Sequence, residues 1–366
     1  MKIIYKLLFL FLLTIGYSSC DFLDIVPDEI TTEADAFKDR NAAKNFVYSC
    51  YGYLPQSNVA SGSLDLLTGD EVITAFEHET FASFPKGNYT ASSPVISYWN
   101  TFFQGLRQCY IFLENVDKVP DLTESVKTDY IAQVKFLIAY YHYQLARCYG
   151  PIILIKELPD VNASQAEYLP RTSYDECVDW ICNLLDEAAS SLPAIRTNKE
   201  DYGLATSVGA KAVKAKMLLY AASPLFNGNS SFYSNFTDKS GSQLMPLTYD
   251  PNKWVKAKTA IKEAIDLAEQ NGHALYVKQD YKIGNEDANP YPAAGPVRCL
   301  RTSLVDWDSR NPEVLLAETR SEGSYGIQNK SLPFVTDGWA WNGVGPTWTM
   351  LNRFYTKNGL PWDEDP

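Results

Sequence analysis

The stretch DYIAQVKFLIAYYHYQLARCY, residues 129–149, decides the architecture of this chain. Its apolar and aromatic residues recur at steps of three and four, which predicts a helix. One stripe of that helix includes Leu137 and Tyr141. A second and mostly aromatic stripe includes Phe136 and Tyr140. Because a helix that is apolar on several sides must be covered by other helices, the stretch predicts the centre of a helical domain.

The residues after this stretch predict how the helix ends. Gly150 is expected to adopt the left-handed conformation that commonly ends a helix, and Pro151 prevents the helix from resuming. The apolar run of residues 152–155 then leads out of the helix. None of these residues forms a catalytic motif, so we interpret the whole stretch as structural.

Helical periodicity recurs elsewhere in the chain. It predicts further helices over residues 99–119, 173–191, 207–226 and 254–270. Another helix, over residues 43–51, is expected to begin at a cap supplied by Asp39 or Asn41. Successive amphipathic helices separated by turns are typical of a tetratricopeptide-like helical-repeat core. Residues 55–97 and 321–348 lack this periodicity, so we expect long loops there.

Three segments carry a resemblance to the SusD/RagB family. Residues 135–155, KFLIAYYHYQLARCYGPIILI, resemble the family's long helix, in which aromatic residues and an Arg precede Tyr-Gly. Residues 174–193 resemble its pattern "Y..I..DL..A...LP". Residues 346–363, PTWTMLNRFYTKNGLPWD, resemble its segment "PT..M...F...DG.P", although Asn358 stands where the family has Asp. The resemblance implies a mainly α, SusD-like fold: a tetratricopeptide-like helical-repeat core with long irregular loops and a few short strands, one of them over residues 311–318.

The N-terminus has the features of a lipoprotein signal peptide. Lys2 and Lys6 make the first residues positively charged. A short apolar core follows and leads to small residues and Cys20. The apolar core is too short to span a bilayer stably. The small residues before Cys20 resemble a bacterial lipobox, in which the Cys is lipidated and becomes the new N-terminus. We therefore expect a lipid anchor on Cys20 that holds the protein at the cell-surface side of the outer membrane.

Composition and resemblance together divide the chain into three parts. Residues 1–19 are expected to be the signal peptide, and residues 20–272 the SusD-like helical-repeat region. After residue 273 Gly, Pro, Asn and aromatic residues become more frequent, so residues 273–366 are expected to begin a loop-rich C-terminal SusD/RagB region. Family members usually continue beyond this point, which favours an incomplete C-terminal region.

The family resemblance implies a function. Members bind nutrients, usually glycans, at the cell surface and deliver them to a SusC-like, TonB-dependent outer-membrane β-barrel transporter without catalysis. A peptide cargo, as in RagB-like proteins, remains an alternative because aromatic surfaces accept both ligands. A second alternative is a helical surface glycoside hydrolase that uses paired acids such as Asp70 and Glu71. A third is a scaffold without a small ligand.

Residue type and loop location indicate which residues could contact a ligand. Large aromatic rings stack well on sugars, and a few polar groups then fix the orientation of the ligand. The predicted binding residues are Trp339, Trp341, Tyr89, Trp99, Asp70 and Asn88. Trp99 also suits a place in the core, because it starts a predicted helix.

Other chemistry finds little support in the sequence. The formal net charge is −12 and no basic patch is present, which argues against a nucleic-acid partner. The three His residues are far apart, and no zinc, P-loop, dinucleotide or Ser-His-Asp motif occurs, so no metal or cofactor is expected. Six Cys residues besides Cys20 lie mostly on apolar helix faces. We expect buried thiols, with one disulfide as an alternative.

Overall fold

The computed structural model describes residues 33–55, 69–160, 162, 169–277, 295–305, 311–319, 326–333 and 340–365. The predicted lipidation site Cys20 and the predicted ligand residue Trp339 lie outside these residues. The main helices are α3 (Arg40–Tyr51), α5 (Trp99–Asn115), α6 (Glu124–Tyr149), α7 (Tyr174–Ser191), α8 (Ser207–Ala222) and α10 (Asn252–Gln270). The shorter helices are α2 (Glu33–Ala36), α9 (Ser230–Tyr233), α11 (Pro296–Val305), α12 (Gly326–Ser331) and α13 (Trp348–Leu351). Short 3-10 helices cover Thr80–Ser83, Val116–Lys118 and Lys199–Asp201. The strands are β1 (Val72–Thr74) and β2 (Val344–Pro346).

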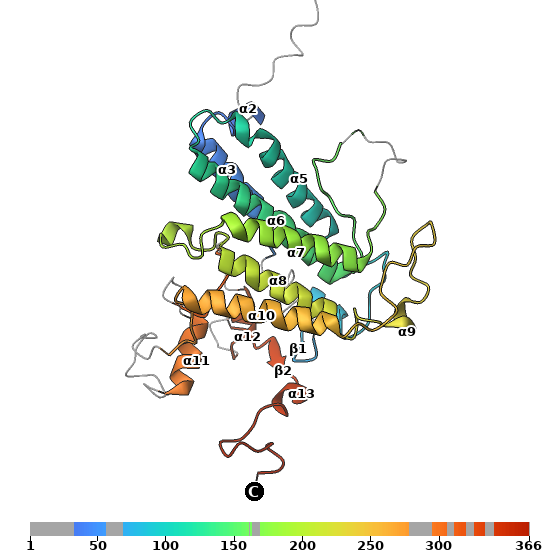
Figure 1. Ribbon diagram of the computed structural model, residues 1–366. Coiled ribbons are helices and arrows are strands. Elements are labelled where there is room, and N and C mark those ends of the chain that lie inside the picture. The colour runs from blue at the N-terminus through green and yellow to red at the C-terminus, as the bar shows by residue number, and fades with distance from the viewer. Residues whose placement is uncertain are drawn as a thin grey trace, which may run out of the picture.

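The main helices form a stack in which chain neighbours are also neighbours in space. Helix α5 packs on α6, α6 on α7, α7 on α8 and α8 on α10, while α3 packs on both α5 and α6 (Figure 1). Each helix thereby covers the apolar face of the one before it, as in other helical-repeat proteins. This arrangement confirms the predicted mainly α, tetratricopeptide-like core.

Helix α6 lies at the centre of this stack. Leu137 and Tyr141 from its first predicted stripe and Phe136 from its second are buried, while Tyr140 is half-buried. The helix begins at Glu124, five residues before the quoted stretch. Tyr141 also donates its hydroxyl proton to the carbonyl of Cys50 on α3, so α6 holds a second helix by a polar contact inside the core.

The end of α6 differs in detail from the prediction. Gly150 has a positive φ of 69°, but its ψ is −123°, so it does not lie in the left-handed helical region. That combination is open to Gly and costly for residues with a Cβ. The chain therefore leaves α6 in a more extended conformation than a left-handed cap would give. The next two residues, Pro151 and Ile152, are buried.

Other predicted boundaries are close to the observed ones. Asp39 caps α3 by accepting the amide hydrogen bond of Ala42 at 2.8 Å, which decides between the two predicted caps. Helix α5 ends at Asn115, earlier than predicted, because the chain tightens into the 3-10 helix Val116–Lys118.

The prediction of a strand over residues 311–318 was wrong. This segment is irregular. The side chain of Asn311 accepts the backbone N–H of Glu313 at 3.1 Å and so forms a local turn. Pro312 has no N–H to give to a strand ladder. Turn chemistry therefore outweighs the apolar run that follows.

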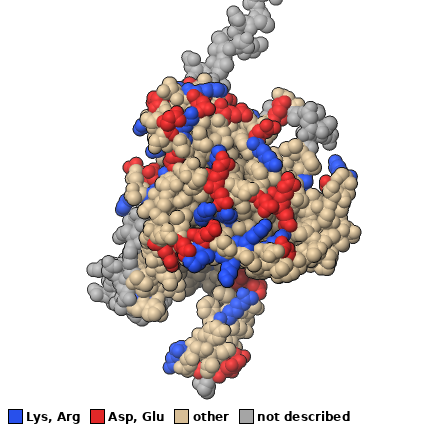
Figure 2. Space-filling view, viewed as in Figure 1, with Lys and Arg blue, Asp and Glu red and all other residues tan. Residues whose placement is uncertain are grey.

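The helical surface carries charges of both signs. Figure 2 shows Lys and Arg beside Asp and Glu across the face formed by α7, α8 and α10. Asp186 of α7 pairs with both Lys211 and Lys214 of α8 at 2.6 Å, and Lys253 of α10 pairs with Asp175 of α7 at 2.5 Å. These pairs connect neighbouring helices of the stack. The face shown has no continuous basic stripe of the kind that binds a phosphate backbone.

The cysteines in the described part of the chain are free thiols. Cys50, Cys109, Cys177 and Cys182 are buried, as the sequence predicted, and Cys148 and Cys299 are half-buried. Burial raises the pKa of Cys177 to about 11 and that of Cys182 to about 12, so both stay protonated and unreactive at neutral pH.

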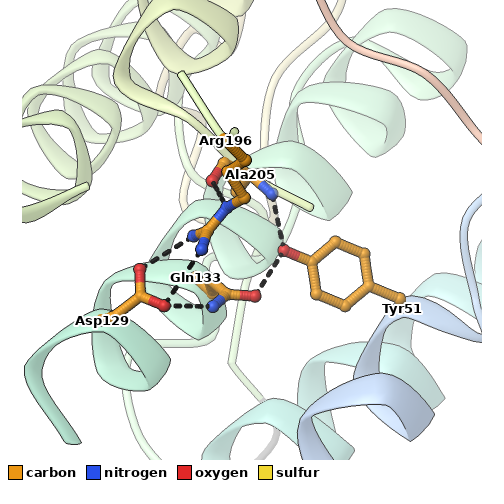
Figure 3. Close-up of polar contacts among 5 residues, drawn as sticks. All are labelled: Tyr51, Asp129, Gln133, Arg196 and Ala205. Carbon is orange, nitrogen blue, oxygen red and sulfur yellow. Dashed lines mark hydrogen bonds and ion pairs between the residues drawn. The ribbon is translucent and has the colours of Figure 1, made fainter. Parts of the chain in front are cut away.

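A partly buried polar network fastens three parts of the stack (Figure 3). Arg196, from the segment after α7, donates to both carboxylate oxygens of Asp129 on α6 at 3.2 and 2.8 Å and to the carbonyl of Ala205 at 3.0 Å. Tyr51 of α3 donates to Gln133 at 3.0 Å and accepts the N–H of Ala205 at 2.9 Å. Gln133 in turn donates to Asp129 at 2.8 Å. The side chains of the network thus serve as hydrogen-bond donors and acceptors for one another and for the backbone of Ala205.

We expect Arg196→Met to lower the free energy of unfolding by about 2 kcal/mol. The change leaves Asp129 without its cation and Ala205 without a donor, and breaking a buried pair costs about 3–5 kcal/mol. The smaller figure allows for solvent, because the Asp129 side chain is 27% exposed. Urea unfolding followed by circular dichroism measures the loss. Arg107→Met, which removes an exposed hydrogen bond to Pro159, is the control and should change stability little. Equal stabilities of the two variants would contradict the role given to the network.

Candidate functional site

The small sheet unites the two long loops that the sequence predicted. Strands β1 and β2 are antiparallel, with Val72 opposite Pro346 and Thr74 opposite Val344. Thr347 extends the contact, since its hydroxyl donates to the carbonyl of Asp70 at 2.6 Å, 277 positions away in sequence. Within the loops predicted over residues 55–97 and 321–348, the structure thus adds β1, the 3-10 helix Thr80–Ser83, α12 and β2. Candidate residues from both loops therefore share one substructure.

A small apolar cluster underlies this sheet. Phe81 is buried and packs against Val72, Phe84 and Val344. We call these four residues the Phe81 cluster. It is separate from the main core of the helical stack. The cluster gives the two loops a common rigid base.

Tyr89 and Asn88 lie beside the Phe81 cluster. The ring of Tyr89 is 5.5 Å from that of Phe84, and about half of the Tyr89 side chain is exposed. Asn88 is exposed, and its backbone N–H donates to the carbonyl of Ser83 at 3.1 Å. The structure therefore presents one supported aromatic ring next to an exposed Asn residue. Their role in ligand binding stays a prediction.

Trp341 approaches the same substructure from the other loop. Its side chain is 42% exposed, and its backbone N–H donates to the carbonyl of Asn329 on α12 at 2.9 Å. Gly343 follows and donates its N–H to the carbonyl of Lys330. A Cβ at position 343 would lie 2.1 Å from the ring of Phe76, so only Gly allows this approach. Trp341 is thus held by its backbone between α12 and β2.

Asp70 lies two residues before β1 and is largely exposed. An Nη atom of Arg353 lies 3.5 Å from its carboxylate, and Arg353 is also exposed. Arg353 was not among the predicted residues, because nothing in its sequence neighbourhood shows that it meets a carboxylate so distant in the chain. Together the two side chains place one acceptor and one donor group at the edge of the sheet.

Trp99 packs elsewhere. It belongs to the half-buried residues that cover the main core. Its ring meets Tyr149 edge-on at 5.2 Å and Phe103 at 4.9 Å, and the guanidinium of Arg171 lies 5.4 Å from the ring centre. This is the core interpretation that the sequence left open for Trp99. Its role in ligand binding stays a prediction.

The segment after the sheet also exposes aromatic rings. Figure 1 shows it extending away from the helical stack beyond α13. Trp348, Phe354, Tyr355 and Trp362 are exposed, and the indole N–H of Trp362 donates to Asn352 at 2.7 Å. They were not among the residues predicted from the sequence, and we leave them out of the candidate site.

A groove on the helical stack is a less suitable site. Its volume is about 770 Å³, and residues that line it include Lys44, Tyr48 and Tyr130. The groups of Asp129 and Arg196 at this groove are engaged in the network of Figure 3. Ligand sites need polar groups that can contact the ligand. Arg196 and Asp129 are only 11% and 27% exposed, whereas the Asp70 side chain is 64% exposed.

Paired acids give little support to hydrolysis. A glycoside hydrolase needs a carboxylic acid whose pKa is raised, so that it can protonate the leaving oxygen. A second group of adjacent acids is Asp363-Glu364-Asp365. Hydrogen bonds from Thr356 and Asn358 lower the pKa of Asp365 instead of raising it. Asp70 and Glu71 are both exposed. Neither arrangement resembles a general acid held in an apolar pocket.

Within the described ranges, no group of three or more His, Cys, Asp or Glu side chains is arranged to hold a metal ion. Of the helices in the same ranges, none is both long and apolar enough to cross a bilayer.

A comparison with protein families decides the classification. The model of a SusD-like family, described as "Starch-binding associating with outer membrane", matches residues 21–219. The chain belongs to this SusD-like family. The match includes the helices from α3 to most of α8, which also carry two of the three segments that suggested the SusD/RagB resemblance.

Individual relatives agree with this assignment. SusD-like protein P25 from Formosa agariphila is 23% identical over 230 residues, which are 59% of this SusD-like chain and 43% of P25. The solved structure of BT4246 is 30% identical with a TM-score of 0.76, over 90% of this chain and 59% of that one. A SusD-like protein from Bacteroides fragilis, BF3747, has 20% identity and a TM-score of 0.66, over 91% and 56% of the two chains. The chain thus spans about half the length of these relatives.

Proposed function

We propose that this SusD-like chain binds oligosaccharides or polysaccharides without cleaving them, at the surface formed by Tyr89, Asn88, Asp70 and Trp341. One observation carries the proposal: the β1–β2 pairing joins the two loops that hold these residues. Exposed rings on a rigid base stack on the apolar faces of sugars, and the amide and carboxylate accept or donate hydrogen bonds to hydroxyls. The description of the family as starch-binding supports the same class of ligand.

The wider role is proposed from the family. We infer that Cys20 carries the lipid anchor, that the protein is exposed at the outer membrane, and that it delivers glycans to a SusC-like, TonB-dependent transporter. The family description, "associating with outer membrane", supports the location. The proposed division into residues 1–19, 20–272 and 273–366 belongs to this inference as well. The β1–β2 pairing crosses the boundary at residue 273, so the helical and loop-rich regions contribute jointly to the site.

Affinity electrophoresis tests the proposed function. The protein without its first 20 residues is run through gels cast with a panel of polysaccharides, and each sample is assayed for new reducing ends. We expect retardation by at least one glycan without new reducing ends. Release of reducing ends would favour the hydrolase. Absence of retardation on every gel would reject glycan binding and favour a peptide cargo or a scaffold.

A further inference from the structure

A buried carboxylate belongs to the loops that carry the proposed site. The Glu79 side chain is only 5% exposed, and its Oε1 forms an ion pair with Nζ of Lys330, which is 19% exposed. The exposed imidazole of His78 is 3.6 Å from the same carboxylate oxygen. A carboxylate at this depth is costly unless a cation compensates it. Lys330 is therefore the partner that allows Glu79 to be buried.

The two residues belong to the two different loops of the site. Glu79 immediately precedes the 3-10 helix Thr80–Ser83, which contains Phe81, and its carbonyl accepts the N–H of Ala82 at 3.0 Å. Glu79 thereby fixes the start of the segment that leads to Tyr89.

Lys330 acts on the other loop. It lies on α12, and its carbonyl accepts the N–H of Gly343, two residues after Trp341. Asn329, the preceding residue, accepts the N–H of Trp341. One residue thus holds the Trp341 loop with its backbone and the Tyr89 loop with its side chain.

We propose that the Glu79–Lys330 ion pair is a positioning element of the binding site, which sets the placement of Trp341 relative to Tyr89. This inference rests on the proposed function. The two residues need not touch the ligand. The β1–β2 sheet and the Phe81 cluster also join the two loops, but they do so at β2, beyond Trp341 in the chain. The ion pair is a side-chain link from α12, whose backbone holds Trp341, so we expect its loss to loosen the placement of Trp341 relative to Tyr89. A platform that must be ordered on binding has a lower affinity than one that is already ordered.

The test compares Lys330→Met with Lys253→Met in the mature protein. Lys253 pairs with Asp175 on the helical stack and is similarly shielded, at 13% exposure, so it controls for the loss of an ion pair. We expect Lys330→Met to weaken binding of the glycan identified on the affinity gels about tenfold, with an unchanged thermal midpoint of the helical core. Lys330→Arg, which keeps the charge, should restore most of the affinity. Lys253→Met should bind like the wild type.

Hydrogen exchange separates the inference from the proposed function. In Lys330→Met, the amides of Trp341 and Gly343 should exchange faster, while those of α6 should not change. Unchanged exchange at both amides would overturn the positioning role, whatever the glycan result. Faster exchange with wild-type affinity would overturn it too. If the wild-type protein bound no glycan on any gel, the proposed function would fail. Faster exchange in Lys330→Met would then still show that the ion pair holds the Trp341 segment in place.

Discussion

Trp341→Ala is expected to weaken glycan binding about 30-fold or more, which corresponds to about 2 kcal/mol. The indole is 42% exposed and belongs to a segment that two backbone hydrogen bonds hold against α12. Truncation removes the larger of the two proposed stacking rings, and central aromatic residues dominate binding energies. Isothermal titration with the glycan that retards the wild-type protein measures the loss.

Trp254→Ala is the matched control for this prediction. Trp254 is also 42% exposed, but it lies on α10 of the helical stack. We expect this variant to retain the wild-type affinity. An equal loss of affinity in the two variants would show that any exposed Trp contributes to binding, whatever its position. That result would reject the proposed site. Tyr89→Ala should weaken binding in the same direction as Trp341→Ala.

Acid is expected to destabilise the helical stack through His142. Burial lowers the pKa of His142 from 6.5 to about 4, against a smaller opposing effect of its hydrogen bond to the carbonyl of Ile138. The ring contacts that carbonyl through Nδ1 at 2.8 Å and accepts the N–H of Ile155 through Nε2 at 3.1 Å. This pattern requires the neutral ring with its proton on Nδ1, because protonation of Nε2 would remove the acceptor of Ile155.

The direction of the pH effect follows from these two pKa values. Below pH 6.5 His142 becomes protonated in the unfolded chain, whereas in the folded chain it stays neutral until the pH falls to about 4. Stability is therefore fully present above pH 6.5 and is lost as the pH falls toward 4, by about 3 kcal/mol in total. Carboxylates also titrate at the lower end of this range, so the effect of His142 is measured as a difference between proteins.

Urea unfolding at pH values between 7.5 and 4 measures this difference. In His142→Gln, which cannot titrate, the loss of stability between pH 6.5 and 5 should be much smaller than in the wild type. His273→Gln should keep the wild-type pH dependence, since His273 is only half-buried and bonds to Pro312 at the surface of the stack. Parallel curves for the wild type and His142→Gln would contradict the assigned cause.

The helical stack could be predicted from the sequence because its information is local. The periodicity of residues 129–149 marks both apolar stripes of α6, and the Gly-Pro pair after Tyr149 marks its end. The exact backbone angles of Gly150 could not be predicted, because they depend on where the buried residues after it pack. The short strands were beyond prediction, since three residues are too few to show alternation.

The candidate site could be predicted only in part, because some of its information is local and some is not. Tyr89, Asp70 and Trp341 were predicted from residue type and loop location, but their union in one substructure depends on contacts between distant segments. Glu79 and Lys330 were missed because a charged residue in a polar loop gives no sign that it is buried. Trp99 was assigned to the ligand surface and to the core with equal reason, and only its contacts with Tyr149 and Phe103 show how it packs.

The pairing of β1 with β2 has a consequence for the order in which the protein folds. Contacts between sequence neighbours form quickly, whereas closing a loop of 277 positions, as between Asp70 and Thr347, is entropically costly and slow. The helices from α5 to α10 lie between these two ends, and α3 precedes them, so the whole stack can assemble first. During synthesis the sheet must wait until residue 347 has emerged, so the ligand surface is completed only after the helical stack exists. A kinetic experiment should therefore detect helix formation before Trp341 reaches its final environment.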